Sequence, residues 1–121
     1  MTTREEVQTF LNKMTNDRVK DETVELMLSM AIISVNQEKS SAASNDIIDA
    51  AILTDAAYLS YLAYATEFER TVGDVPLPML THLGELKLLA TKYLGYAIRG
   101  VTARVPVIVS TESIDTISSF T

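Results

Sequence analysis

Apolar side chains recur along residues 1–100 at the three- and four-residue spacing of amphipathic α-helices. The first such stretch follows the run from Thr3 to Glu6, a capping box in which the threonine hydroxyl and the glutamate carboxylate each accept a hydrogen bond from the other residue's backbone amide. A helix of about three turns should follow, because the next apolar residues form one stripe, made of Val7, Phe10, Leu11 and Met14. A helix this short must pack on a larger element.

The second apolar stretch differs, because it is apolar around most of its circumference instead of along one stripe. Its first turn is acidic and follows a polar turn, so we expect a helix capped at Asp21 or a neighbour and ending near Glu38. Between Leu26 and Val35 all but two of the residues are apolar. A helix of this kind is covered on several sides.

A longer helix should follow the small, polar linker at 39–45, capped by Asn45 or Asp46 and extending to about Arg70. At 1.5 Å per residue it spans roughly 36 Å, which makes it the spine of the fold. Three tyrosines, three residues apart, form a ribbon of rings along it. Such a ribbon lies either at the margin of the core or in an interface, where tyrosine is enriched.

The run from Gly73 to Pro78 ends that helix, since glycine suits a left-handed C-cap and two prolines prevent immediate continuation. A fourth helix then continues to about Arg99, with Gly100 as its stop. Gly84 and Gly95 lie three turns apart on nearly the same face of this helix and lower its propensity. They predict a tight helix crossing.

After Gly100 the apolar period changes from helical spacing to strict alternation, which predicts an extended segment between 101 and 110. Pro106 has no amide to donate, so this segment is an edge strand or an isolated arm. The sequence therefore predicts an all-α fold, a bundle of about four helices over residues 1–100, with an extended C-terminal arm over residues 101–121.

Charge and chemistry narrow the functional classes. The net charge of −6 argues against a general nucleic-acid binder. The chain has no cysteine, so it has no disulfide and no thiolate metal site. Four basic residues follow one another without an intervening acid, and they form either a solvated helix face or a phosphate-binding stripe. These basic candidates are Lys87, Lys92, Arg99 and Arg104. With one histidine, His82, and no nucleotide, metal or nucleophile motif, we expect no enzyme activity, no cofactor and no metal.

The apolar content is high for a chain that lacks a membrane span. The longest apolar run, 47–65, carries Asp49 and Asp55, each of which opposes insertion into a bilayer. We therefore expect a cytoplasmic protein without membrane contact. Since 47% of residues are hydrophobic and 21% charged, one small fold leaves apolar surface uncovered. Homo-oligomerisation resolves that excess.

The order of elements resembles the small head-to-tail adaptor, or connector, proteins of tailed bacteriophages. The likeness is carried by the short capped helix at 3–14, the polar turn, the run at 21–31 and the start of the long helix at 46–53. In that family, helical bundles stand side by side in a ring beneath the portal, and a C-terminal arm reaches a neighbouring chain or ring. The resemblance implies a structural virion protein, assembled in the host cytoplasm, with portal and tail-side neck proteins as partners and DNA passing through the ring without specific binding.

The resemblance also implies where the contacts lie. The second and third helices and the arm would supply the interface residues, for which the candidates are Leu26, Met27, Met30, Ile33, Tyr58, Tyr61, Tyr64, Val105, Val107 and Val109. The alternative is a small helical regulatory module, monomeric or dimeric, whose basic residues bind an acidic protein or a nucleic acid. Steeply salt-dependent binding to nucleic acid would favour that alternative.

Overall fold

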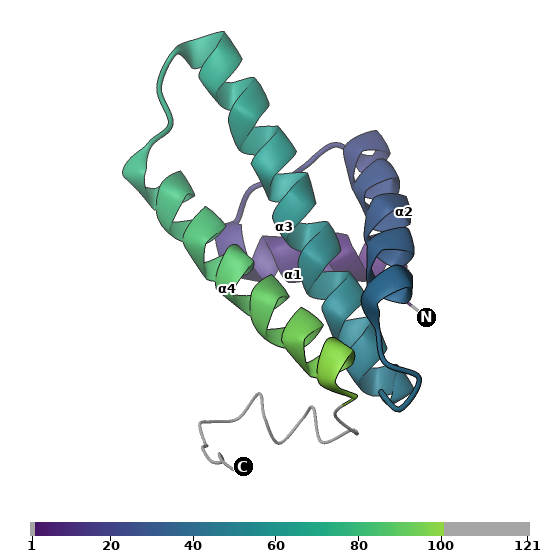
Figure 1. Ribbon diagram of the computed structural model, residues 1–121. Helices are drawn as coiled ribbons and strands as arrows, with labels where there is room; N and C mark the ends of the chain where they lie inside the picture. The colour runs from purple at the N-terminus through teal and green to yellow at the C-terminus, as the bar shows by residue number, and fades with distance from the viewer. Residues whose placement is uncertain (1, 101–121) are drawn as a thin grey trace.

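Four α-helices make up the protein in the computed structural model, which describes residues 2–100 (Figure 1). They are α1 (Arg4–Thr15), α2 (Asp21–Glu38), α3 (Asn45–Val72) and α4 (Leu77–Arg99), and residues 2–100 contain no strand. The predicted all-α bundle of four helices is confirmed. The predicted arm at 101–121 lies outside the described residues.

Three helix ends form as their sequences predict. At the start of α1 the Thr3 hydroxyl accepts from the amide of Glu6 at 3.3 Å, and the Thr3 amide donates to the Glu6 carboxylate at 2.9 Å. This is the predicted capping box. α3 and α4 end at glycines in the left-handed region, Gly73 at φ 98° and Gly100 at φ 72°, where a side chain would be strained.

Two predicted caps are wrong. α2 begins after Lys20, which makes no side-chain cap, and the Asp21 carboxylate instead accepts from Gln8 at 2.9 Å and from Arg18 at 3.2 Å. In α3 the capping residue is Ser44, whose hydroxyl accepts from the amide of Ile47. α3 also continues to Val72, so its 28 residues span about 42 Å at 1.5 Å per residue.

The core is built around α3, which contacts each of the other three helices. In Figure 1, α2 and α4 lie along opposite sides of α3, and α1 crosses the bundle. The side chains that α3 buries completely include Ile47, Ala51, Ala57 and Tyr61. Small alanines at the contact let the neighbouring helices approach the spine closely. The prediction that the long helix is the spine is confirmed.

The glycines of α4 do not mark a crossing within the chain. A Cβ added to Gly84 would meet no atom within 4 Å, and one added to Gly95 would meet only the Arg99 guanidinium at 3.3 Å. The buried residues of α4 include Leu86 and Ala97, and helical periodicity puts both glycines on the opposite side. The tight crossing predicted there is therefore wrong for the single chain.

Candidate assembly surfaces

α2 presents an unpaired apolar stripe to solvent. Leu26, Met30 and Ile33 are 57%, 48% and 58% exposed, and their spacing of four and three residues places them on one side of the helix. We call these three residues the α2 face. The opposite side of α2 is buried against the bundle through Val24 and Val35.

Of the four candidates predicted on this helix, three form the α2 face and the fourth, Met27, is half-buried beside it. The second helix was expected to be covered on several sides, and among residues 2–100 only one side is covered. The sequence pattern therefore calls for more contacts than residues 2–100 supply.

α4 carries a second exposed apolar surface that the sequence did not single out. Its largest exposed side chains are Leu77 at 74% and Leu88 at 72%, accompanied by Leu80 at 50% and Ile98 at 46%. We call these four residues the α4 face. Leucine occurs on all sides of this helix, so the sequence did not single out Leu77, Leu88 and Ile98 as exposed residues.

The two faces point to opposite sides of the molecule. α2 and α4 each pack mainly on α3, and they flank it on opposite sides in Figure 1. Because each helix buries the side toward α3, the α2 face and the α4 face are directed away from each other.

The two helices also differ in charge. α2 holds four acids, Asp21, Glu22, Glu25 and Glu38, and no base. α4 holds three bases and one acid, Glu85.

The basic candidates within the described residues are all exposed and all on α4. They are Lys87, Lys92 and Arg99. The Lys92 ammonium lies 5.8 Å from the centre of the Tyr93 ring, and the Arg99 guanidinium lies 5.4 Å from that of Tyr96, distances at which a cation is attracted to the ring face. The remaining basic candidate, Arg104, lies outside the described residues, as do the arm candidates Val105, Val107 and Val109.

Tyr61 is not a surface residue, so its place among the predicted interface candidates is wrong. It is 0% exposed, and its hydroxyl donates to the Asp17 carboxylate at 2.5 Å. Burial, together with the hydrogen bond to Asp17, raises the pKa of Tyr61 above its usual value. The tyrosine therefore ties α3 to the loop that joins α1 and α2.

The other two tyrosines of the ribbon lie at the margin of the core. The Tyr64 ring stacks on that of Tyr61 with centroids 5.5 Å apart, and burial raises the pKa of Tyr64. Tyr58 is half-buried and lines a small cavity with Asp55 and Lys87. Burial, and secondarily the nearby Glu38, raises the pKa of Asp55.

His82 has the surroundings of a structural histidine. Its ring meets the Tyr61 ring edge-on at 6.2 Å, and its Nδ1 lies 3.6 Å from the Glu85 carboxylate one turn along the same helix. In the part of the chain that the structure describes, no group of three histidine, cysteine or acidic side chains is arranged to hold a metal ion.

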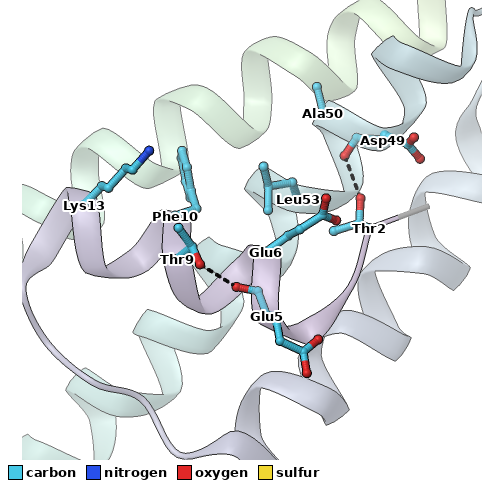
Figure 2. Close-up of a pocket in the computed structure, with 9 residues that line it drawn as sticks. All are labelled: Thr2, Glu5, Glu6, Thr9, Phe10, Lys13, Asp49, Ala50 and Leu53. Atoms are coloured by element: carbon cyan, nitrogen blue, oxygen red, sulfur yellow. Dashed lines mark hydrogen bonds between the residues drawn. The ribbon is translucent and has the colours of Figure 1, made fainter.

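An open groove lies between α1 and α3 (Figure 2). It measures about 480 Å³ and has an apolar wall formed by Phe10, Ala50 and Leu53. Its polar side chains come mostly from α1, including Glu6 and Lys13. The groove was not predicted from the sequence, because its residues come from segments that are brought together only by the fold. Its open, mixed lining is that of a shallow surface seam between two packed helices.

Within residues 2–100, no helix combines the length and the apolar character that crossing a membrane requires. We compared the chain with protein-family models, curated proteins and solved structures, and none of the three comparisons returned a match.

Proposed function

We propose that this protein is a structural adaptor whose copies assemble side by side into a ring, of the kind that joins the head to the tail in tailed bacteriophages. The observation that carries the proposal is the pair of exposed apolar surfaces, the α2 face and the α4 face, on opposite sides of one small bundle.

Two different surfaces favour a ring over a pair. A single self-complementary patch gives a two-fold dimer, whereas contacts between unlike patches repeat from copy to copy and close into a ring when the rotation per copy divides the circle. Exposed side chains such as Leu26 on one flank and Leu88 on the other are each apolar enough to favour removal from water. Repetition of one such contact removes apolar surface of both faces from water on every copy.

From the resemblance to phage adaptors, the proposed ring lies between the head and the tail of the virion. The proposed partners are the portal on one side and tail-side neck proteins on the other, in a virion assembled in the host cytoplasm. A net charge of −6 suits a channel through which DNA passes without specific binding, because phosphate neutralisation needs a positive footprint. The proposed role is structural and requires no catalytic residue.

Negative-stain imaging of the purified full chain tests this proposal. The expected result is closed rings of several copies, as cyclic assembly through unlike surfaces predicts. A population of monomers or two-fold dimers at every concentration would contradict the adaptor and favour the regulatory module.

One observation favours that second candidate, a protein- or nucleic-acid-binding module. Lys87, Lys92 and Arg99 are exposed together on α4, and cations that neutralise phosphates give binding that weakens steeply with salt. The module predicts tight binding of a DNA duplex at about 50 mM salt that is lost by about 200 mM. The adaptor predicts weak binding at both.

A further inference from the structure

The α2 face and the α4 face are complementary in more than apolar character. Within residues 2–100 neither face is covered: Leu26 and Ile33 on α2 and Leu77 and Leu88 on α4 are each more than half exposed. Because the faces lie on opposite sides of α3, one copy cannot bring them together. A second copy in the same orientation, displaced sideways, does so.

Charge selects which faces meet. α2 has four acids and no base. Two of these acids are paired within the chain, Glu25 with Arg4 and Asp21 with Arg18. The repulsion in a pair of α2 helices would therefore come from the other two, of which Glu22 borders the α2 face. α4 has three bases and one acid, so pairing α4 with α4 would also place like charges against each other. Contact between α2 and α4 brings opposite charges together and disfavours both symmetric alternatives.

The charged residues stand close to the apolar ones that would make the contact. On α2, Glu22 is one turn before Leu26, and on α4, Lys92 is one turn after Leu88, so that each pair shares a side of its helix. Lys87 lies next to Leu88 in sequence and is also exposed. Glu22 therefore borders the α2 face, and Lys87 and Lys92 border the α4 face together with one acid, Glu85.

The glycines of α4 fit the same contact. Gly84 lies one turn before Leu88, on the solvent side, and no atom of residues 2–100 lies within 4 Å of where its Cβ would be. Glycine at such a place lowers helix propensity, and nothing in the described chain compensates. A helix of a second copy that lies across α4 would gain close approach at that position.

We infer that the α2 face of one copy packs on the α4 face of the next, head to tail, with Leu26, Met30 and Ile33 of α2 lying against the middle of α4 around Gly84 and Leu88. This inference rests on the proposed function in one respect, namely that the copies assemble with each other. It goes further by naming the two surfaces and the polarity of the contact.

Two double variants, each with one of the two faces disrupted, test the inference. We call them the blocked chains. One carries Leu26→Gln and Ile33→Gln, and the other carries Gly84→Gln and Leu88→Gln. Leu26, Ile33 and Leu88 are each more than half exposed, and the Cβ of a residue at position 84 would enter open space. Because glutamine is also a good helix former without charge, both chains should keep their fold. Circular dichroism checks this. Thr9→Gln on the exposed side of α1 is the matched control and should assemble like the wild-type chain.

The masses are then measured by light scattering at a concentration where the wild-type chain assembles. Each blocked chain alone should be a monomer, because it keeps only one of the two unlike faces. A mixture of the two should give a one-to-one heterodimer and nothing larger, since the α4 face of the first chain is intact and so is the α2 face of the second.

A blocked chain that still dimerises alone would overturn the inference, because symmetric pairing would then be at work. A mixture that stays monomeric would overturn it as well, and so would a wild-type chain that stays monomeric up to about 1 mM, the affinity of a very weak contact. If the heterodimer forms while the wild-type chain makes open filaments, the inference stands and the ring proposal fails. If rings persist in both blocked chains, the ring stands and the inference fails.

Discussion

α1 and α2 are neighbours in sequence, and they distribute their apolar residues in opposite ways. α1 has one stripe, and its residues Val7 and Leu11 are 0% exposed. α2 is apolar on several sides and buries one of them, so that Leu26 and Ile33 remain more than half exposed. The apolar stripe of α1 is buried by the other helices of the bundle. The apolar residues on the outer side of α2 would be buried only by a contact beyond this bundle.

The comparison separates two kinds of apolar residue. Those that face α3 hold the fold together, and those on the α2 face and the α4 face contribute to assembly. Substitutions of the first kind should lower the free energy of unfolding of the monomer, and substitutions of the second kind should leave it nearly unchanged.

The largest effect is expected at the centre of the α1 stripe. Leu11→Ala should lower the free energy of unfolding by roughly 2 to 5 kcal/mol, because Leu11 is completely buried and its loss leaves a cavity. Leu26→Ala, the same change at a position 57% exposed, should cost about 0.5 kcal/mol or less. Urea unfolding at low protein concentration measures both, and equal losses would show that α2 is covered within the chain.

A smaller loss is expected at Tyr61. Tyr61→Phe removes the hydrogen bond to Asp17 and should cost about 1 to 3 kcal/mol, since the acceptor is a carboxylate. Tyr58→Phe is the matched control on the half-buried margin of the same helix, and it should change stability by about 0.5 kcal/mol or less. A larger loss at Tyr58 than at Tyr61 would contradict the division between core and margin.

The same tyrosine should make the fold sensitive to alkali. Because burial raises the folded-state pKa of Tyr61 above its usual value near 10, the folded protein holds this proton more tightly than the unfolded chain does. Its contribution to stability is complete below pH 10 and falls as the pH rises further, by at most about 1.4 kcal/mol per pH unit. Urea midpoints between pH 9 and pH 11 measure the slope, which should be shallower in Tyr61→Phe.

The capping box should have an effect of about 1 kcal/mol. Thr3→Ala removes the hydroxyl that accepts from the amide of Glu6, and losses of this kind are typically about 1 kcal/mol. Thermal unfolding followed by circular dichroism detects it. Thr9→Ala, which changes an exposed hydroxyl inside α1, is the control, and a loss at Thr9 that matches that at Thr3 would count against the cap.

The smallest effect carries the opposite sign. Gly84→Ala should stabilise the monomer by roughly 0.5 to 1 kcal/mol, because the added methyl group enters open space and alanine favours the helix. Gly73→Ala, at φ 98°, should destabilise it instead. If Gly84→Ala lowered the melting temperature of the monomer, the outward side of α4 would have to be packed within the chain.

The sequence predicted those features that depend on local signals. The capping box at Thr3, the glycine stops at Gly73 and Gly100 and the four helical periods all appear in the structure. The cap of α3 was missed because Ser44, Asn45 and Asp46 are adjacent polar residues, each of which can cap a first turn. α2 has no side-chain cap, and the Asp21 carboxylate accepts from Gln8 and Arg18 instead.

Features that depend on how helices are oriented could not be predicted. A three-residue spacing shows that Tyr58, Tyr61 and Tyr64 are neighbours on a helix, but not that Tyr61 alone points inward to Asp17. In the same way, helical spacing places Gly84 and Gly95 on one side of α4 without saying which side is buried. The candidate surfaces became visible only when the packing on α3 was known.

Light scattering on the wild-type chain beside its Leu26→Gln and Ile33→Gln double variant, at equal concentration, tests the account most directly. We predict that the wild-type chain assembles into a species many times the mass of one copy, while the variant, with the same helical content, stays a monomer. Equal masses for the two chains would contradict the claim that the exposed side of α2 is an assembly surface.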